Sequence, residues 1–495
     1  MSLTAEPTAP PGRRLRARAL GARVLRTMAA LRPGPVWPSL LLAGLLVLRM
    51  ARKIPLLPEP TADSAAYLAQ AAYRPPLYGA LLQAWQALFG GLEHLPMAQL
   101  LLLGAALGWF GVELARLLRR WWAGPAAILV TLLHTAVHDS PTWLLTEAVY
   151  LAIILAGLAL LCRHAHRPRP GALLGAAACF GLATLARSTG LVFVVLPLLL
   201  ALFDRRLPLW PALKTALAAA LVVAGVLAGG MAATWQRHGH FELGSWSGIS
   251  LLGKALLLAQ PEDAARLPPP VAATLPMVLR NRALLAAQPD LAARLRAQVQ
   301  SSGDLRFGAF WPAAEASWPA WQAADDRGKG QLALALDRAL IAAHPWEYLT
   351  LWAHDWLALV IHPGYWPAWA TTEAADPSAF ALCGTAGNCW ALQRYDQPLA
   401  GFVALFGVSI LGTALALGLA VGLARRVLRR RAAPDVVLAW GLALAVHASL
   451  LGSSAFEYGM VRYTIALHVL DLALLLWLAA RLLPRPGGAA AARPG

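Results

Sequence analysis

Six ionisable residues lie beside long apolar runs of the chain. They are Asp63, Asp139, Glu147, Arg187, Glu457 and Arg462. An ionisable group at the centre of a membrane-spanning helix costs roughly 2.5–3.5 kcal/mol, so such groups tend to face a cavity or a partner. Carboxylates accept protons from attacking groups, and guanidinium groups bind anions. The set therefore indicates a polar cavity, provided that the fold brings its members to one face.

Asp63 is the residue best suited to acid–base chemistry, and two interpretations of it are open. It precedes the stretch Ser64-Ala65-Ala66-Tyr67, which has the composition of a helix. An aspartate in that position is a favoured helix N-cap. Its carboxylate is equally suited to take a proton from an attacking hydroxyl group.

The composition predicts that membrane helices position these residues. Of 495 residues, 58% are hydrophobic and 14% are charged, whereas soluble globular chains carry about 25% charged residues. An ordinary cytosolic enzyme and a disordered protein are excluded. The predicted fold class is an all-α polytopic membrane protein.

Ten apolar runs are predicted to cross the membrane, since a spanning helix needs about 20 apolar residues. They lie near 36–51, 97–118, 122–138, 143–162, 171–186, 188–203, 211–233, 400–424, 433–452 and 463–482. Residues 346–362, which His354 and Asp355 interrupt, are predicted as a juxtamembrane helix. Spans there and near 249–260 would raise the count to 11 or 12.

Basic residues predict the sidedness, because cytoplasmic loops are enriched in Lys and Arg. The first 34 residues hold seven arginines and one acid, Glu6, and further basic blocks follow at 116–120, 163–169, 205–214 and 425–431. Arg49, Arg52 and Lys53 do not fit this pattern. The net charge of +17 is thus explained by topology, and nucleic acid is not a predicted partner.

The predicted organisation follows from these spans and loops. A basic cytoplasmic tail occupies 1–34, and seven membrane helices with a first outer loop at 52–96 occupy 35–233. An extracytoplasmic, mainly helical region follows at 234–399, then three membrane helices at 400–482 and a disordered cytoplasmic tail at 483–495. In this arrangement all six ionisable residues lie at or near the outer face.

Several short motifs occur in this order on the outer side. Asp63-Ser64-x-x-Tyr67 is followed by Arg74-Pro-Pro-Leu-Tyr78, by Thr146-Glu147, by the Gly-Leu-Ala-Thr-Leu-Ala-Arg segment that ends at Arg187, by His344-Pro-Trp-Glu-Tyr348, and by Glu457 with Arg462-Tyr463. The chain resembles the glycosyltransferase-C superfamily, in particular its protein mannosyltransferase and aminoarabinose transferase group. These polytopic enzymes take a sugar from a polyprenyl-phosphate carrier.

The resemblance implies a mechanism and a site. Asp63 would be the catalytic base for an acceptor hydroxyl, Arg187 and Arg462 would stabilise the leaving phosphate, and the anomeric centre would invert. The substrate-binding residues implied are Tyr67, Arg74, Tyr78, Asp139, Glu147, Arg187, Glu457 and Arg462. Many members carry a second acid where this chain has Ser64. No cofactor is therefore assigned, although the site leaves room for Mg²⁺ or Mn²⁺.

Each of these residues also has a structural interpretation. Arg187 can reach phospholipid headgroups, and Arg462 can form a clamp with Glu457. Glu147 can be a satisfied polar group between helices. Tyr67 and Tyr78 can be packing aromatics, and Asp139, which precedes Ser-Pro, can be a turn residue.

The predicted outer region is rich in tryptophan and holds two of the four cysteines. It contains 11 of the 20 tryptophans, which predicts an interfacial aromatic belt, with a sugar-binding groove as the alternative. Residues 262–300 predict an amphipathic helix. Cys383 and Cys389 enclose a short loop, which predicts a disulfide in an oxidising compartment, with free thiols as the alternative.

The leading hypothesis is therefore a transferase of the bacterial inner membrane, with its site on the extracytoplasmic side. Its partners would be a polyprenyl-phosphate-linked sugar, a lipid, polysaccharide or protein acceptor, and membrane lipids. Two other hypotheses are a transporter or flippase of lipid-linked glycans, and an accessory membrane protein. A transporter is expected to place polar residues near the membrane midplane, whereas here they gather at one face.

Overall fold

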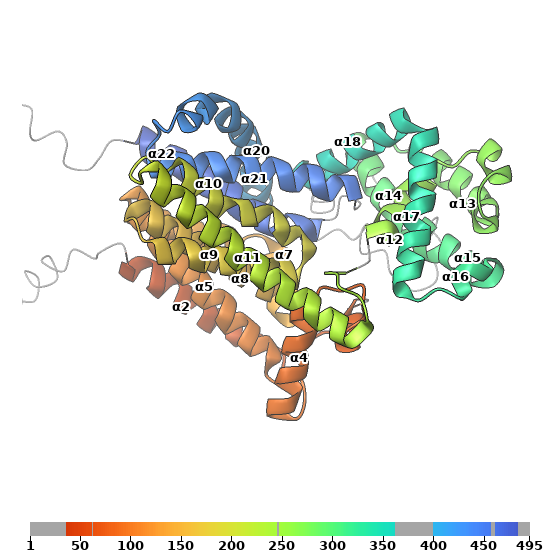
Figure 1. The fold of residues 1–495 in the computed structure, drawn as a ribbon, viewed down its shortest axis with the longest axis horizontal. Helices are drawn as coiled ribbons and strands as arrows, with labels where there is room; N and C mark the ends of the chain where they lie inside the picture. The colour runs from red at the N-terminus through yellow and green to blue at the C-terminus, as the bar shows by residue number, and fades with distance from the viewer. Residues whose placement is uncertain (1–35, 62, 245–246, 362–398, 457–460, 484–495) are drawn as a thin grey trace, which may run out of the picture.

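The chain forms a helical bundle that carries a smaller group of helices at one end. The computed structural model describes residues 36–61, 63–244, 247–361, 399–456 and 461–483. Within these ranges the regular elements are helices, together with one isolated β-bridge between Glu59 and Trp143. The bundle lies on the left of Figure 1 and the group α12–α18 on the right.

Six described helices are long and apolar enough to cross a membrane. They are α5 (Leu95–Leu118), α8 (Glu147–His166), α11 (Leu209–His238), α20 (Leu399–Leu428), α21 (Pro434–Phe456) and α22 (Ile465–Leu482). Four shorter apolar helical segments accompany them: α2 (Val36–Ala51), α6 (Ala123–Leu132), α9 (Pro170–Ala186), and η2 (Ser188–Val194) with α10 (Val195–Phe203). Every predicted apolar run thus contains a helix, and the count of ten spans stays a prediction.

The long helices differ in how much protein surrounds them. The apolar window of α8 is 78% buried, and those of α21, α5 and α22 are 72%, 67% and 67% buried. The window of α11 is only 22% buried and that of α20 33%. A helix that is apolar on all sides but exposed needs an apolar solvent, so α11 and α20 present the surface that suits lipid.

The predicted run 122–138 is not one helix. Its first part forms α6, which ends at Leu132, and its second part forms the short α7 (Thr135–Asp139). His134 takes an extended backbone conformation between them, and its ring lies 5.2 Å from that of His468 in α22. The 3₁₀ helix η1 (Ser140–Thr142) follows α7.

The group at the end of the bundle contains nine helical elements. They are α12 (Ser247–Leu256), η3 (Pro261–Ala265), α13 (Pro269–Ala286), α14 (Leu291–Gly303), the π-helical η4 (Asp304–Phe310), α15 (Trp311–Ser317), α16 (Pro319–Gln322), α17 (Asp326–Ala343) and α18 (Pro345–Ile361). The helix predicted over 262–300 is wrong as one element, because it breaks between α13 and α14. Pro289 precedes Asp290, whose carboxylate caps α14 by accepting a hydrogen bond from the Ala293 amide at 2.7 Å.

Three tryptophans of this group pack inside it instead of forming an interfacial belt. Trp311, Trp318 and Trp321 pack with Phe310, and their ring centroids lie 5.1–6.3 Å apart. Trp321 is fully buried. These side chains therefore form the core of the group, while Trp346 at the start of α18 is 76% exposed.

A buried ion pair inside the group lies where the group meets the bundle. Lys254 of α12 lies 2.7 Å from Asp355 of α18, and both side chains are 1% exposed. Lys254 also donates to the carbonyl of Ser454 at the end of α21. Trp352 of α18 donates to the Ser454 hydroxyl at 2.8 Å, so three helices meet at this point.

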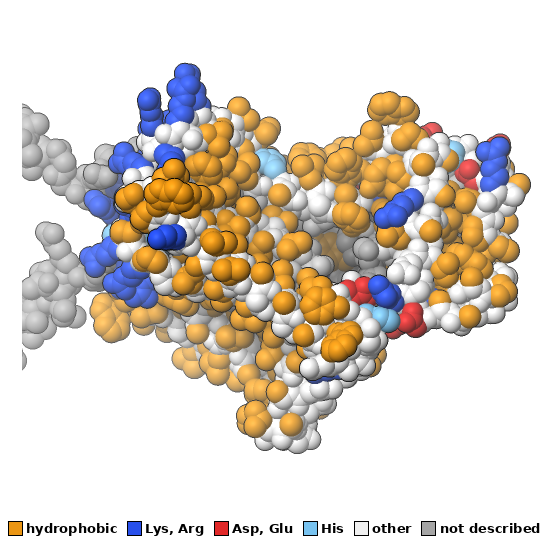
Figure 2. Space-filling model, in the orientation of Figure 1, with side chains coloured by type: hydrophobic (Ala, Val, Ile, Leu, Met, Phe, Trp, Pro, Cys, Tyr) orange, Lys and Arg blue, Asp and Glu red, His pale blue; other side chains and the backbone are white. Residues whose placement is uncertain are grey.

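Lys and Arg side chains gather at the end of the bundle opposite α12–α18 (Figure 2). The loops that connect α8 to α9, α10 to α11 and α20 to α21 supply basic residues at 163–169, 205–206 and 425–431. The molecule thus has a basic end, and an opposite end that carries the first loop and the helical group.

Candidate functional site

Asp63 forms an ion pair with Arg74 in the loop between α2 and α5. It stands at the N-terminus of α3 (Ser64–Leu68), yet its carboxylate makes no capping hydrogen bond. Its Oδ1 instead accepts from Nη2 of Arg74. Asp63 is thus the N-cap residue by position, but its side chain does not cap the helix. The carboxylate is held in place while its side chain remains 20% exposed.

Ser64 fixes the start of α3 in the place of a second acid. Its hydroxyl donates to the Leu144 carbonyl at 3.0 Å and accepts from the Thr61 amide at 2.7 Å. The β-bridge between Glu59 and Trp143 lies beside it. The loop that carries Asp63 is thus fastened to the segment that leads into α8.

Arg74 and two tyrosines form an aromatic cluster behind the carboxylate. The guanidinium lies 5.1 Å from the Tyr67 ring centroid, and Tyr67 packs edge-on against Tyr78 with centroids 5.3 Å apart. Tyr78 belongs to α4 (Pro76–Phe89) and donates to Oε1 of Gln99 at 3.0 Å. Both tyrosines are buried, so the structure gives them packing contacts.

Glu147 and Arg187 form a second acid–arginine pair. Glu147 is the first residue of α8, and Arg187 ends α9. Nη1 of Arg187 donates to Oε1 of Glu147 at 2.5 Å, and the two side chains are 14% and 1% exposed. The guanidinium also lies 4.7 Å from the Tyr463 ring centroid, next to η9 (Val461–Thr464). Arg187 is thus engaged within the protein rather than directed only at lipid headgroups.

Tyr67 and Tyr78 join the loop of the first pair to the start of α8, because they pack in one apolar cluster with Val149. Burial raises the pKa of Tyr78 above its ordinary value, and the negative charge of Glu147 raises it further. A charge influences a pKa in this way only at short range. We refer to Asp63, Arg74, Glu147 and Arg187, with Tyr67 and Tyr78, as the paired-charge site.

The remaining predicted residues do not all reach this site. Asp139 lies 2.8 Å from Nδ1 of His138, and both side chains are 40% or more exposed. Arg462 is part of η9, but its side chain lies outside the described residues, as do Glu457, Cys383 and Cys389. Their roles, and the disulfide, stay predictions.

Three further contributors were not anticipated from sequence. Gln99 of α5 accepts from Tyr78 and donates to the Pro141 carbonyl at 2.9 Å. Arg237 and His238, at the end of α11, line a small cavity with Tyr67 and Arg74. Gln99 is a polar residue within an apolar run, and Arg237 is a charged residue at the end of another apolar run. Both positions could therefore have been noticed in the sequence.

The described residues do not offer a metal site. Within them, no three His, Cys, Asp or Glu side chains are grouped as ligands. Asp63 is engaged by Arg74 and Ser64 by Leu144, so the donors expected beside Asp63 do not fit Mg²⁺ or Mn²⁺, which favour several oxygen ligands. No step of the mechanism is assigned to a metal.

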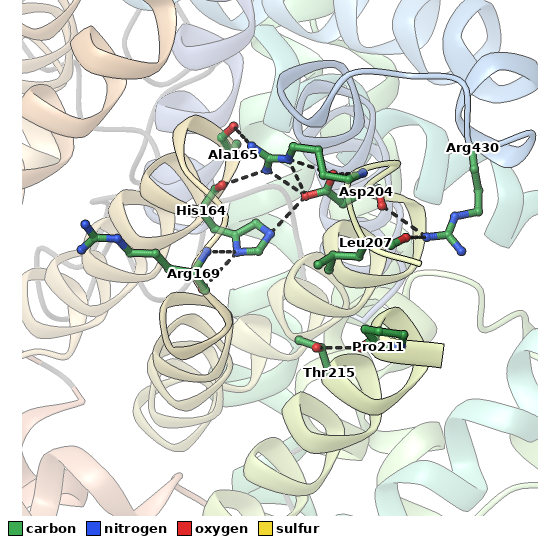
Figure 3. Close-up of polar contacts among 9 residues, drawn as sticks. His164, Ala165, Arg169, Asp204, Leu207, Pro211, Thr215 and Arg430 are labelled. Carbon is green, nitrogen blue, oxygen red and sulfur yellow. Dashed lines mark hydrogen bonds and ion pairs between the residues drawn. The ribbon is translucent and has the colours of Figure 1, made fainter. Parts of the chain in front are cut away.

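A separate polar network holds the basic end together (Figure 3). Asp204, in the turn between α10 and α11, is fully buried and accepts from Nε and Nη2 of Arg206 at 3.0 and 2.8 Å. Nε2 of His164 lies 3.3 Å from the same carboxylate. Arg430, from the α20–α21 turn, donates to the carbonyls of Asp204 and Leu207 at 3.2 and 2.7 Å. Two loops are thereby joined.

Asp204→Asn is expected to remove stability at neutral pH but not in acid. Burial alone would raise the pKa of Asp204, but the bonds from His164 and Arg206 outweigh it, so the pKa lies well below its ordinary value. A depressed carboxyl pKa stabilises the fold above the unfolded pKa, near 3.9, and this contribution is lost as pH falls through the folded pKa. Thermal unfolding in detergent should show a lower Tm for the variant at pH 7 and a shrinking difference below about pH 4. A difference that does not depend on pH would contradict this assignment.

Comparisons with known proteins identify no relative. No protein-family model matches the chain, and no curated protein or solved structure matches it. The resemblance to the glycosyltransferase-C superfamily therefore stays a prediction from motifs. Any function must be argued from the residues of the paired-charge site.

Proposed function

We propose that the chain is a membrane glycosyltransferase that moves a sugar from a polyprenyl-phosphate carrier to an acceptor hydroxyl. The observation that carries the proposal is that two acid–arginine pairs, Asp63 with Arg74 and Glu147 with Arg187, stand on segments that pack together through Tyr67 and Tyr78. A partly exposed carboxylate and a guanidinium are the two groups that this transfer needs. Both occur at the end of the bundle away from the basic loops.

Asp63 is the proposed general base. The acceptor O–H gives its proton to the carboxylate while its oxygen forms a bond to the anomeric carbon. The bond from that carbon to the phosphate oxygen breaks, and polyprenyl phosphate leaves with its electron pair. Displacement from the opposite side inverts the anomeric centre. A positioned base contributes about 10²–10⁴-fold to such a step.

Arg187 is the proposed stabiliser of the leaving phosphate. A phosphodiester becomes a monoester as the carrier departs, so negative charge increases and a preorganised cation lowers the barrier. Glu147 engages Nη1 of Arg187, and a guanidinium has five N–H donors in all. Arg74 keeps Asp63 oriented, and Arg462 is proposed as a second phosphate ligand.

The charge distribution supports an extracytoplasmic site. Basic loops stay in the cytoplasm, and the basic end lies opposite the first loop (Figure 2). We therefore place the protein in a bacterial inner membrane with the paired-charge site facing outward. Lipid, polysaccharide or protein is the proposed acceptor.

The test is carrier release by the purified protein in proteoliposomes. A panel of polyprenyl-phosphate sugars is supplied with a cell-envelope extract, and free polyprenyl phosphate and glycosylated acceptor are measured by mass spectrometry. Release that matches acceptor glycosylation, with inversion, is expected. Movement of the intact lipid-linked glycan between leaflets without release would contradict the transferase and favour a flippase.

A further inference from the structure

A cavity of about 450 Å³ opens among the helices of the α12–α18 group. It lies between α13, α14 and α18 and the turn that follows α12. Leu257, Leu285 and Leu351 contribute apolar surface, while Arg282 and Arg294 contribute cations. Its volume falls in the range of small-molecule sites, roughly 300–1,000 Å³. It shares no lining residue with the paired-charge site.

The cavity lies along one face of α18. The other two faces of this helix show which surroundings the cavity has. Glu347, Thr350, Leu351 and His354 line it at helical spacing. A second face docks on α21, where Tyr348 donates to the Ala455 carbonyl at 2.8 Å. The third face is apolar and open, with Trp346 76% and Leu349 40% exposed. Such a helix suits the membrane surface, which would place the cavity beside lipid.

The charges in the cavity favour an anion. Within the described part of the chain, neither Arg282 nor Arg294 makes an ion pair or a side-chain hydrogen bond, and both are exposed. Glu347 is the one acid of the lining. Burial lowers the pKa of His354 below its ordinary value; the charge of Asp355 opposes this shift and that of Arg294 adds to it. The lining therefore carries two cations against one acid.

We propose that this cavity binds an anionic amphiphile drawn from the adjacent membrane surface. Arg282 and Arg294, on neighbouring helices, hold its phosphate head, and the leucines accommodate its alkyl chain. A guanidinium is well matched to phosphate, and apolar walls reward burial of methylene groups. The site does not depend on the proposed transferase activity.

Photolabelling of the full-length protein in phosphatidylcholine nanodiscs tests the site. The probe is dodecyl phosphate with a diazirine near the end of its chain, and the comparison is a neutral dodecyl glucoside with the same diazirine. The phosphate probe is expected to label peptides from α13, α14 or α18. The double change Arg282→Gln and Arg294→Gln should reduce this labelling by about tenfold or more, because bonds to a charged group are lost.

Two further substitutions separate binding from folding. Ala286→Trp fills the cavity from an exposed position and should abolish labelling while both arginines remain. Ala283→Trp, on the same helix but outside the lining, should label like the wild type, and Glu347→Gln should label at least as well. Equal labelling by the neutral probe, competition by millimolar inorganic phosphate alone, or unchanged labelling of the arginine variant would overturn the proposal. Thermal unfolding of each variant shows whether it is folded.

Discussion

Asp63→Asn is expected to reduce the release of polyprenyl phosphate by about 10²–10⁴-fold, with little change in donor binding. The amide cannot accept the acceptor's proton, while its size and its contact with Arg74 are nearly preserved. The pair is mostly buried, with Arg74 18% and Asp63 20% exposed, but the oxygen of the new amide can still accept a hydrogen bond from Arg74, so the guanidinium keeps its partner. The variant should therefore fold and fail mainly in kcat.

Glu93→Gln supplies the matched control for this change. Glu93 is an exposed carboxylate of the same loop, so its amide variant removes one negative charge from the loop without touching Asp63. Its release rate is expected to stay near that of the wild type. Asp63→Glu should recover part of the lost rate because it restores a base at a shifted position. Equal turnover by wild type and Asp63→Asn would remove Asp63 from the mechanism.

Arg187→Met is expected to cost about 3–5 kcal/mol of stability, since it leaves a buried carboxylate without its counter-charge. Glu147 is only 1% exposed, and water cannot replace the lost partner there. The loss should appear as a large fall in Tm or in the unfolding free energy in detergent. Arg187→Lys should fall less, because it keeps the charge but loses the fork of donors.

The double variant Glu147→Met with Arg187→Met distinguishes a clamp from a catalytic pair. Replacing both partners of a buried pair by apolar residues is often neutral for stability, so the fold should recover. Carrier release should remain strongly reduced, because the phosphate loses the cation that Arg187 supplies. Recovery of both stability and release would mean that the pair is structural only. Failure to recover stability would show that the contact between Arg187 and Tyr463 contributes more to stability than the ion pair does.

The helices were largely predictable, because a backbone in hydrocarbon must satisfy its own hydrogen-bonding groups, as a helix does. Each apolar run contains a helix, since hydrocarbon admits few other backbone forms. The break at Pro289 and Asp290 was missed, although a proline before an N-cap residue is a standard helix boundary. The burial of Trp321 was not predictable, because composition does not tell a membrane-facing aromatic from one that packs on Phe310.

The candidate site was only partly predictable. The sequence order placed Asp63, Arg74, Glu147 and Arg187 on one face, but it did not give the pairing. Glu147 and Arg187 are 40 residues apart, and their contact depends on how α8 and α9 pack. Gln99 was passed over because a single amide in an apolar run has many structural explanations.

The buried contact between Lys254 and the end of α21 also has a consequence for folding during synthesis, because its two partners leave the ribosome at different times. Lys254 precedes Ser454 by 200 residues, and a ribosome adds about 5–20 residues per second. The group α12–α18 is complete only once Ile361 has been made, 93 residues before Ser454, so Lys254 and Asp355 lack their contact with α21 for roughly 5–20 s. During this interval the face of α18 that later packs on α21 is exposed. A nascent chain stalled after residue 361 should therefore be a strong client for chaperones at the membrane, and one stalled after α21 has emerged should not.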